Sequence, residues 1–233
     1  MFKHTIPAFF ISAGIAFAGY SVGHAISQNQ NFNRYVSVKG LAERVVKSDR
    51  AVWQLNFGYV DDDLNNAYQG LAKAQTAVKD FLQKQGFTAS DVELQPVAII
   101  DNDANTYNSN VKGKRYMANT GVTLTTNQVD KVKEAVQQTG RLVEQGVLVN
   151  SSQVHYLYTD LNSIKPGLLD EATTNAKAAA ESFARNAHSQ LGSIRQASQG
   201  LFSISDTSDP SSTLGTDVMK KVRVVTSVDY FLK

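Results

Sequence analysis

The spacing with the clearest chemical meaning is Asp101-x-Asp103-x-Asn105, the alternation of oxygen ligands that opens a calcium-binding loop. The next position of such a loop needs glycine and the twelfth needs glutamate, but the chain has Thr106 and Lys112 there. Oxygen-rich segments are also common in hairpin loops. We therefore take Asp101, Asp103 and Asn105 as the metal candidates of the chain, while expecting a polar hairpin loop, no metal site and no cofactor.

Histidine could supply acid–base catalysis, but neither His155 nor His188 has a His or Cys three or four residues away. The absence of cysteine excludes thiol catalysis, disulfides and cysteine-ligated zinc. The chain also lacks the short motifs of nucleotide sites and serine hydrolases. We predict no catalytic residue and no enzyme activity, although a Ser/His/Asp triad assembled from distant positions stays open.

Aromatic side chains offer two interpretations. Trp53, Phe57 and Tyr59 share one face of a strand with period two, and such a row usually belongs to a core. Tyr156 and Tyr158 follow in a later strand. Trp53, Tyr156 and Tyr158 are therefore candidates either for ligand contacts or for the core.

Two small basic clusters also admit two interpretations. They consist of Lys112, Lys114 and Arg115, and of Lys220, Lys221 and Arg223. Each could contact anionic lipid or an acidic partner, or could be the solvated charge that protects a strand edge. The formal net charge of +2 argues against a nucleic-acid partner.

Three segments with apolar residues at steps of three and four predict helices. The first follows the capping residues Asp61 to Asp63 and ends at Gly86. The second covers about 127–146. The third starts with Pro166 in its first turn and ends at Gly192.

Segments with alternating apolar residues predict strands. They cover residues 34–38, ended by Gly40, and 51–60, 92–100, 115–125, 147–159, 193–204 and 221–232. We read 206–217 as a loop. The order ββα-ββα-β-α-ββ predicts an α+β fold with mostly antiparallel sheets and three main helices. Residues 34–233 form this domain, and a division into two lobes stays open.

The N-terminal segment has the pattern of an export signal. Lys3 precedes residues 5–26, an apolar run that is long enough to cross a bilayer, which needs about 20 residues. Ala16-Phe17-Ala18 offers a cleavage site. Residues 1–28 are thus a signal peptide or an N-terminal membrane anchor, followed by a spacer over 29–33, and both alternatives export the body.

Several motifs, taken in order, resemble the SIMPL-domain family, in particular members with an N-terminal hydrophobic segment. They are VSVKGLAERV at 36–45, DRAVW at 49–53, YMA at 116–118, the alanine-spaced helix at 172–187, LGSI at 191–194, QGLFSI at 199–204 and VRVVTSVDY at 222–230. The resemblance implies a bacterial protein of the periplasm or envelope, soluble or anchored to the inner membrane. It also implies a ring-like or channel-like homo-oligomer and, in some members, a role in oxidative stress defence. The family supplies no catalytic residues.

We therefore expect an exported, non-enzymatic SIMPL-like protein that acts as a homo-oligomer and is linked to oxidative or envelope stress. Pairing of sheet edges, or packing of the third helix, would join the copies. Two alternatives are a periplasmic binding module for a small molecule or envelope polymer, and an enzyme of unrecognised type. Residues 5–26 would contact the membrane if they are not cleaved, and no nucleic acid is expected.

Overall fold

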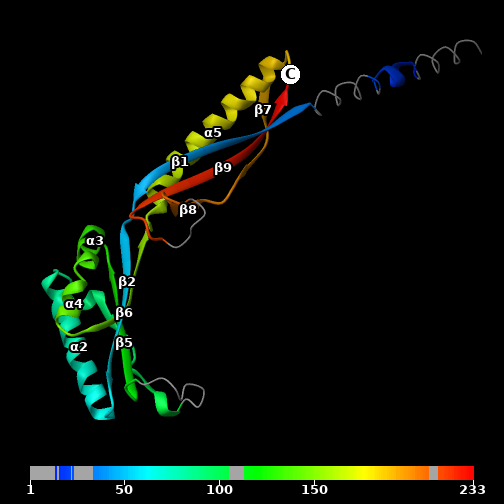
Figure 1. The fold of residues 1–233 in the computed structure, drawn as a ribbon. Helices are drawn as coiled ribbons and strands as arrows, with labels where there is room; N and C mark the ends of the chain where they lie inside the picture. Colours follow the sequence, from blue (N-terminus) through cyan, green and yellow to red (C-terminus); the bar gives the residue numbers. More distant parts are fainter. Residues whose placement is uncertain (1–13, 15, 22, 24–33, 105–112, 210–214) are drawn as a thin grey trace, which may run out of the picture. The chain divides into compact units, whose positions relative to one another are not determined.

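The computed structural model describes residues 14, 16–21, 23, 34–104, 113–209 and 215–233 (Figure 1). Most of the apolar run at 5–26, the spacer at 29–33 and Asn105 lie outside the described residues. Within those described residues, no helix is both long enough and apolar enough to cross a membrane. The chain divides into two compact units. Unit 1 consists of Met1–Arg44, Ile164–Ser203 and Arg223–Lys233. Unit 2 consists of Val45–Ser163 and Ile204–Val222.

The protein has an α+β fold with mostly antiparallel sheets, which confirms the predicted class. The strands are β1 (Tyr35–Lys47), β2 (Arg50–Asp61), β3 (Val92–Leu94), β4 (Ala98–Asp101), β5 (Tyr116–Thr126), β6 (Leu148–Leu157), β7 (Leu191–Gln199), β8 (Ser203–Asp206) and β9 (Met219–Leu232). The helices are α2 (Leu64–Lys84), α3 (Val129–Gln137), α4 (Gly140–Glu144) and α5 (Leu161–Asn186), with 3₁₀ turns at Ala89–Asp91 and Asn102–Ala104.

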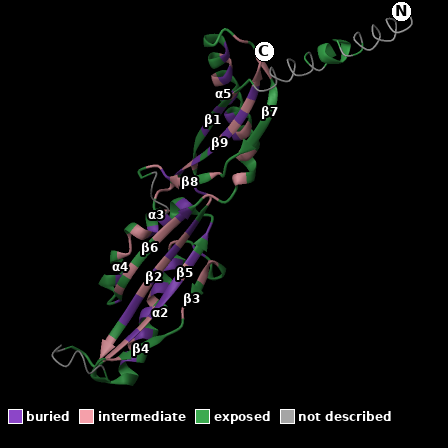
Figure 2. Cartoon of the chain, turned by 90° about the vertical axis from the view of Figure 1, so that its right-hand side faces the viewer, coloured by how far each residue is buried: buried purple, intermediate pink, exposed green. Residues whose placement is uncertain are grey.

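Unit 2 is built on a sheet with strand order β3-β5-β2-β6, in which β4 also pairs with β5. Strand β2 runs antiparallel to β5 and to β6. Helices α2, α3 and α4 lie on one side of this sheet (Figure 1). The apolar row of β2 faces them, so that Trp53, Leu55 and Phe57 are buried with residues of α2 (Figure 2).

Helix α2 begins and ends as its sequence predicts. The side chain of Asp63 caps it by accepting a hydrogen bond from the Asn66 backbone N–H at 2.9 Å. Gly86 follows it with a φ of 85°, and the next residue, Phe87, donates its backbone N–H to the Leu82 carbonyl. This is a Schellman end, for which glycine is the favoured residue.

Unit 1 is built on strands β1, β9 and β7, which pair in that order. Strand β8 also pairs with β9, but all of β8 after Ser203 belongs to unit 2. Strand β7 runs antiparallel to β9. Helix α5 covers one face, and alanines on α5 pack against the alternate residues of β1 and β9. The buried cluster is Val38, Ala176, Ala180, Val228 and Tyr230.

The prediction that Gly40 interrupts the first strand is wrong, because β1 continues through it to Lys47. A Cβ atom at Gly40 would lie 1.8 Å from the Ala172 carbonyl oxygen and 2.8 Å from the Ala176 Cβ. The glycine therefore lets α5 approach the backbone of β1. Its role is close packing between two elements and not a break in one of them.

Both predicted limits of the third helix differ in the structure. Helix α5 begins at Leu161, which places Pro166 inside it. The Asp49 carboxylate accepts hydrogen bonds from the backbone N–H groups of Thr159 and Asp160, and so fixes the chain just before the helix. The helix ends before Gly192, because His188 takes the left-handed conformation with a φ of 53°.

Three other predicted elements are divided. The helix over 127–146 is broken into α3 and α4, and the break turns Val143 outward while Leu142 is buried. The strand over 92–100 is divided around Pro96 into β3 and β4, as expected for a residue that cannot donate a backbone hydrogen bond. The strand over 193–204 is divided into β7 and β8.

Candidate functional site

A cavity of about 180 Å³ in unit 2 combines aromatic walls with buried charge. Its lining consists of Tyr156, Leu157, Tyr158, Ile204, Ser205, Asp206, Gly215 and Lys220. A larger cavity of about 590 Å³ lies beside α2 and β3, but the charged side chains at its margin, Lys79 and Asp80, are exposed. The smaller cavity is therefore the better candidate for a specific site.

The buried charge is an ion pair between Lys220 and Asp206, whose residues are 2% and 1% exposed. The Asp206 carboxylate accepts hydrogen bonds from the Lys220 ammonium, and from the backbone N–H and hydroxyl of Thr216 at 2.9 Å and 3.1 Å. Burial raises the pKa of Asp206, but the hydrogen bonds from Lys220 and Thr216 outweigh it and hold that pKa below 3.8. The Asp206 carboxyl is therefore ionised at neutral pH.

The prediction that Lys220 belongs to a solvated basic cluster, or to a contact with an anionic partner, is wrong. Along β9 the residues Val222 and Val224 are buried, and Lys220 shares their face by the period of two. A lysine on the buried face of a strand needs a carboxylate partner. The alternation of buried residues along β9 could therefore have indicated that Lys220 is buried. No such pattern marks Asp206, which stands at the start of a segment predicted to be a loop.

Tyr156 and Tyr158 reach this cavity, although Tyr156 is itself buried. Burial raises the pKa of the Tyr156 phenol above 10.0. The Tyr156 backbone N–H donates to the Gly215 carbonyl at 2.6 Å, which attaches the segment after residue 214 to β6. The hydroxyls of Tyr158 and Ser163 lie 3.3 Å apart. The cavity is thus lined by two tyrosines and by the residues of the ammonium–carboxylate pair.

Trp53, the third aromatic candidate, lies in the core of unit 2 and not at this cavity. It is 1% exposed, and its indole N–H donates to the Ser152 hydroxyl at 2.9 Å. Its ring meets Phe81 of α2 edge to face, with centroids 6.4 Å apart. This placement gives Trp53 a packing role.

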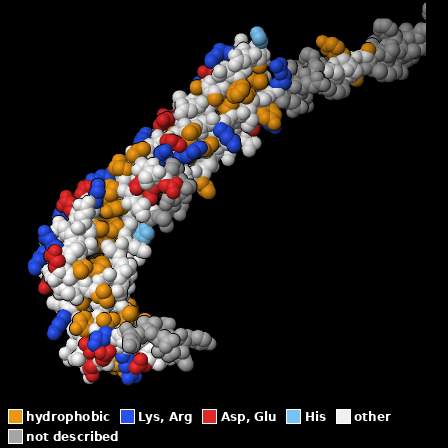
Figure 3. Space-filling view, viewed as in Figure 1, with side chains coloured by type: hydrophobic (Ala, Val, Ile, Leu, Met, Phe, Trp, Pro, Cys, Tyr) orange, Lys and Arg blue, Asp and Glu red, His pale blue; other side chains and the backbone are white. Residues whose placement is uncertain are grey.

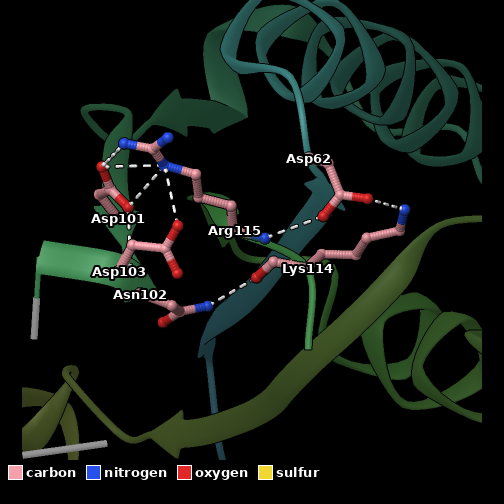
Figure 4. A network of polar contacts seen from close by, with 6 residues as sticks. All are labelled: Asp62, Asp101, Asn102, Asp103, Lys114 and Arg115. Atoms are coloured by element: carbon pink, nitrogen blue, oxygen red, sulfur yellow. Dashed lines mark hydrogen bonds and ion pairs between the residues drawn. The ribbon is translucent and has the colours of Figure 1, made fainter. Parts of the chain in front are cut away.

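The metal candidates Asp101 and Asp103 lie at the end of β4, where they pair with Arg115 (Figure 4). The Arg115 guanidinium lies 3.0 Å from Asp101 and 3.4 Å from Asp103. The hydrogen bond from Arg115 holds the pKa of Asp101 below its ordinary value. Lys114 pairs in turn with Asp62. Among the described residues no group of three or more His, Cys, Asp or Glu side chains is placed to hold a metal.

The two body histidines stand in different units. His155 lies on β6, and His188 is exposed after the end of α5. His188 fills the left-handed position of a Schellman end, in which Ser189 donates its backbone N–H to the Ala184 carbonyl at 2.9 Å. Its position is thus explained by the backbone.

The fold and the cavity define an α+β protein with two antiparallel sheets and a buried ion pair. Residues 36–229 match the family described as SIMPL, protein of unknown function (DUF541). The chain therefore belongs to the SIMPL family, as its motifs predicted.

Two solved structures are distantly similar. A crystal structure of a hydrolase from Listeria innocua shares 11% identity, with 82% of this chain and 91% of that chain covered and a TM-score of 0.21. A crystal structure of an uncharacterised conserved protein from Listeria innocua shares 13% identity, with 78% and 90% covered and a TM-score of 0.18. TM-scores of this size say nothing about the activity of this chain. No curated protein matches it.

Proposed function

We propose that this SIMPL protein is an exported, non-enzymatic envelope protein that works as a homo-oligomer joined through unit 1. The observation that carries the proposal is the edge strand β7 with Leu201 beside it. Strands β1 and β7 are the outer strands of their sheet among the described residues. An outer strand presents unpaired backbone groups that can pair with another copy.

The regular part of β7 is suited to such pairing. Irregularities disturb its pairing with β9 between Leu191 and Gln196, but residues 196–199 pair continuously with β9. Leu201 follows two residues after the end of β7 and exposes 94% of its surface. An isolated exposed leucine is ordinary. A nearly bare leucine beside a free strand edge is the arrangement that a second copy could cover.

Light scattering after size exclusion of the full chain in mild detergent tests the assembly. We expect a mass several times 25.4 kDa. The variant Leu201→Glu should reduce that mass, while Val143→Glu, at an exposed valine of unit 2, should not. A wild-type mass of 25.4 kDa, that of one chain, would contradict the proposal.

The location and the link to oxidative or envelope stress belong to the same proposal and are supported by the family motifs and by the apolar run at 5–26. Cell fractionation and N-terminal sequencing of the mature chain test export. A deletion strain complemented with Leu201→Glu tests the stress role. If peroxide resistance is restored equally by wild type and by the variant, the stress role does not depend on assembly.

A second candidate function, binding of a small molecule in unit 2, is favoured by the cavity beside Lys220. An ammonium has three N–H donors. Among the described residues Lys220 uses one of them, toward Asp206. A small neutral ligand with a carbonyl acceptor and an apolar body would suit the site.

Benzamide is a suitable probe, and amide resonances in nuclear magnetic resonance are the readout. Shifts should cluster at Tyr156 and Tyr158 and should disappear in Lys220→Met. Tyr68→Phe, at an exposed tyrosine of α2, is the control. Shifts that persist in Lys220→Met would exclude this mode of binding.

A further inference from the structure

The open face of the unit 2 sheet carries a layer of uncharged hydrogen-bonding side chains, which we call the amide face. It consists of Gln54, Asn56, Asn119, Thr123, Ser151 and Gln153. These residues alternate with the buried ones of β2, β5 and β6, so they point away from α2, α3 and α4. We propose that the amide face binds a neutral glycan chain.

Glycines make room for the amides on this face. Asn56 is paired across the strands with Gly121, and Asn119 with Gly58. A Cβ atom at Gly121 would lie 2.3 Å from the Asn56 side-chain oxygen, and one at Gly58 would lie 2.4 Å from that of Asn119. Each amide therefore lies across the glycine of the neighbouring strand, and a side chain in place of either glycine would push it off the sheet.

The amides hold one another without using their full capacity. The Asn56 side-chain N–H donates to the Ser151 hydroxyl at 2.9 Å, and the Asn150 side-chain N–H donates to the Asn119 oxygen at the same distance. An amide side chain has two donor and two acceptor sites. Among the described residues, the Asn119 N–H₂ group has no partner. The face is thus ordered and still offers donors and acceptors.

The face carries little formal charge. Strands β2, β5 and β6 contain two charged residues, Arg50 and Asp61, and both stand at the ends of β2. Glu93 of β3 lies opposite Thr123 of β5 and places one carboxylate at the border of the face. Figure 3 shows the Lys, Arg, Asp and Glu side chains of unit 2 gathered over its helices and its lower end, while the side away from the helices is mostly uncharged.

This chemistry favours a glycan over the other macromolecules. A nucleic acid requires Lys or Arg against its phosphates, which the face lacks. A protein interface usually centres on large aromatic or Arg anchors, and the six residues of the amide face include none. Sugar hydroxyls donate and accept at each position, as amides do, and the Glu93 carboxylate at the border of the face can accept from a hydroxyl. The ligand class that matches is a neutral, polyhydroxylated chain.

Isothermal titration calorimetry of the full chain with chitohexaose and with cellohexaose tests the proposal. The variants Asn119→Asp and Gln54→Glu keep the shape and replace amide donors by a carboxylate. Asn119→Asp also keeps an acceptor for Asn150. We expect each to weaken binding at least fivefold. The control is Asn65→Asp, the same change at an exposed position of α2, which should leave binding unchanged.

Each other result overturns the proposal. No binding of either hexasaccharide would do so, as would equal weakening by Asn65→Asp. Binding that is lost in Lys220→Met but not in Asn119→Asp would assign the sugar to the cavity. A fall in the solution mass of Asn119→Asp without a change in sugar binding would assign the face to a second copy of the chain. Because the assembly test uses Leu201, failure of one proposal is distinguishable from failure of the other.

Discussion

At the scale of single residues, the ion pair between Lys220 and Asp206 is the feature with the largest energetic consequence. Both side chains are almost fully buried, so each depends on the other for compensation of its lost hydration. Thr216 adds two hydrogen bonds to the carboxylate. Removing one partner therefore costs more than removing both.

We expect Lys220→Met to lower the free energy of unfolding by about 3–5 kcal/mol, because it leaves the Asp206 carboxylate buried without its cation. The double variant Lys220→Met/Asp206→Asn should recover part of this loss, since the asparagine oxygen can still accept from Thr216. Urea denaturation of the single and double variants measures the coupling. Additive losses in the double variant would show that the two side chains do not act as a pair.

The same pair predicts a loss of stability in acid. The folded pKa of Asp206 lies below 3.8, so the unfolded chain binds the proton at higher pH than the folded chain. The contribution of Asp206 is fully present above pH 3.8 and disappears as the pH falls through its folded pKa. The difference in urea midpoint between wild type and Asp206→Asn should therefore shrink below that pH. A difference that is constant with pH would contradict the assignment.

His188 predicts a stabilising substitution. The left-handed conformation costs a residue other than glycine about 1–2 kcal/mol of folding free energy. Glycine avoids this cost, but part of the gain is offset because glycine makes the unfolded chain more flexible. We expect His188→Gly to stabilise the protein by about 0.5–1 kcal/mol, measured as a denaturant midpoint. The mirror experiment is Gly86→Ala, which places a side chain at a φ of 85° and should destabilise by about 1 kcal/mol. If His188→Gly destabilises the protein, the imidazole makes a contact that matters more than the backbone.

At the scale of elements, the approach of α5 to β1 depends on Gly40. We expect Gly40→Ala to cost about 1–3 kcal/mol, because the added Cβ displaces the helix from the strand. Gly140→Ala is the control, since a Cβ there meets nothing within 4 Å. Thermal unfolding followed by circular dichroism measures both. Equal melting temperatures for Gly40→Ala and wild type would mean that α5 does not pack on Gly40.

Local signals predicted most of the elements, and contacts between distant residues account for the rest. The Asp63 cap, the Gly86 end and the apolar face of β2 follow from nearby sequence, and the structure confirms them. The early start of α5 depends on Asp49, which lies 110 residues before Thr159. Gly40 has its meaning only opposite Ala172.

The sequence predicted only part of the candidate site, because local patterns mark some of its residues and contacts between distant residues bring in the others. Alternating strand residues indicated Tyr156 and Tyr158, which line the cavity. Asp206 pairs with Lys220 across 14 positions, and spacing along the chain does not mark such a pair. The amide face depends on the cross-strand register that places Asn56 opposite Gly121, which the sequence alone does not give.

At the scale of the whole molecule, the cores of the two units differ in the size and number of their buried side chains. The cluster in unit 2 contains Trp53, Phe57 and Phe81 among many other buried residues. The cluster in unit 1 has five residues, of which Ala176 and Ala180 are alanines. Burial of apolar surface contributes roughly 25 cal/mol per Å², so unit 1 gains much less from its core.

We therefore expect unit 1 to open at lower denaturant than unit 2. Hydrogen exchange read by mass spectrometry should show faster exchange in α5 and β9 than in β2 and β5, because local opening follows local core stability. Gly40→Ala should accelerate exchange in unit 1 alone. Trp53→Ala, which removes a side chain that is 1% exposed, should cost about 3–5 kcal/mol and act on unit 2. If either substitution accelerates exchange equally in both units, the chain unfolds as one cooperative body. Other contacts would then compensate for the smaller core of unit 1. The proposed contact between copies through β7 would be the first of these to test.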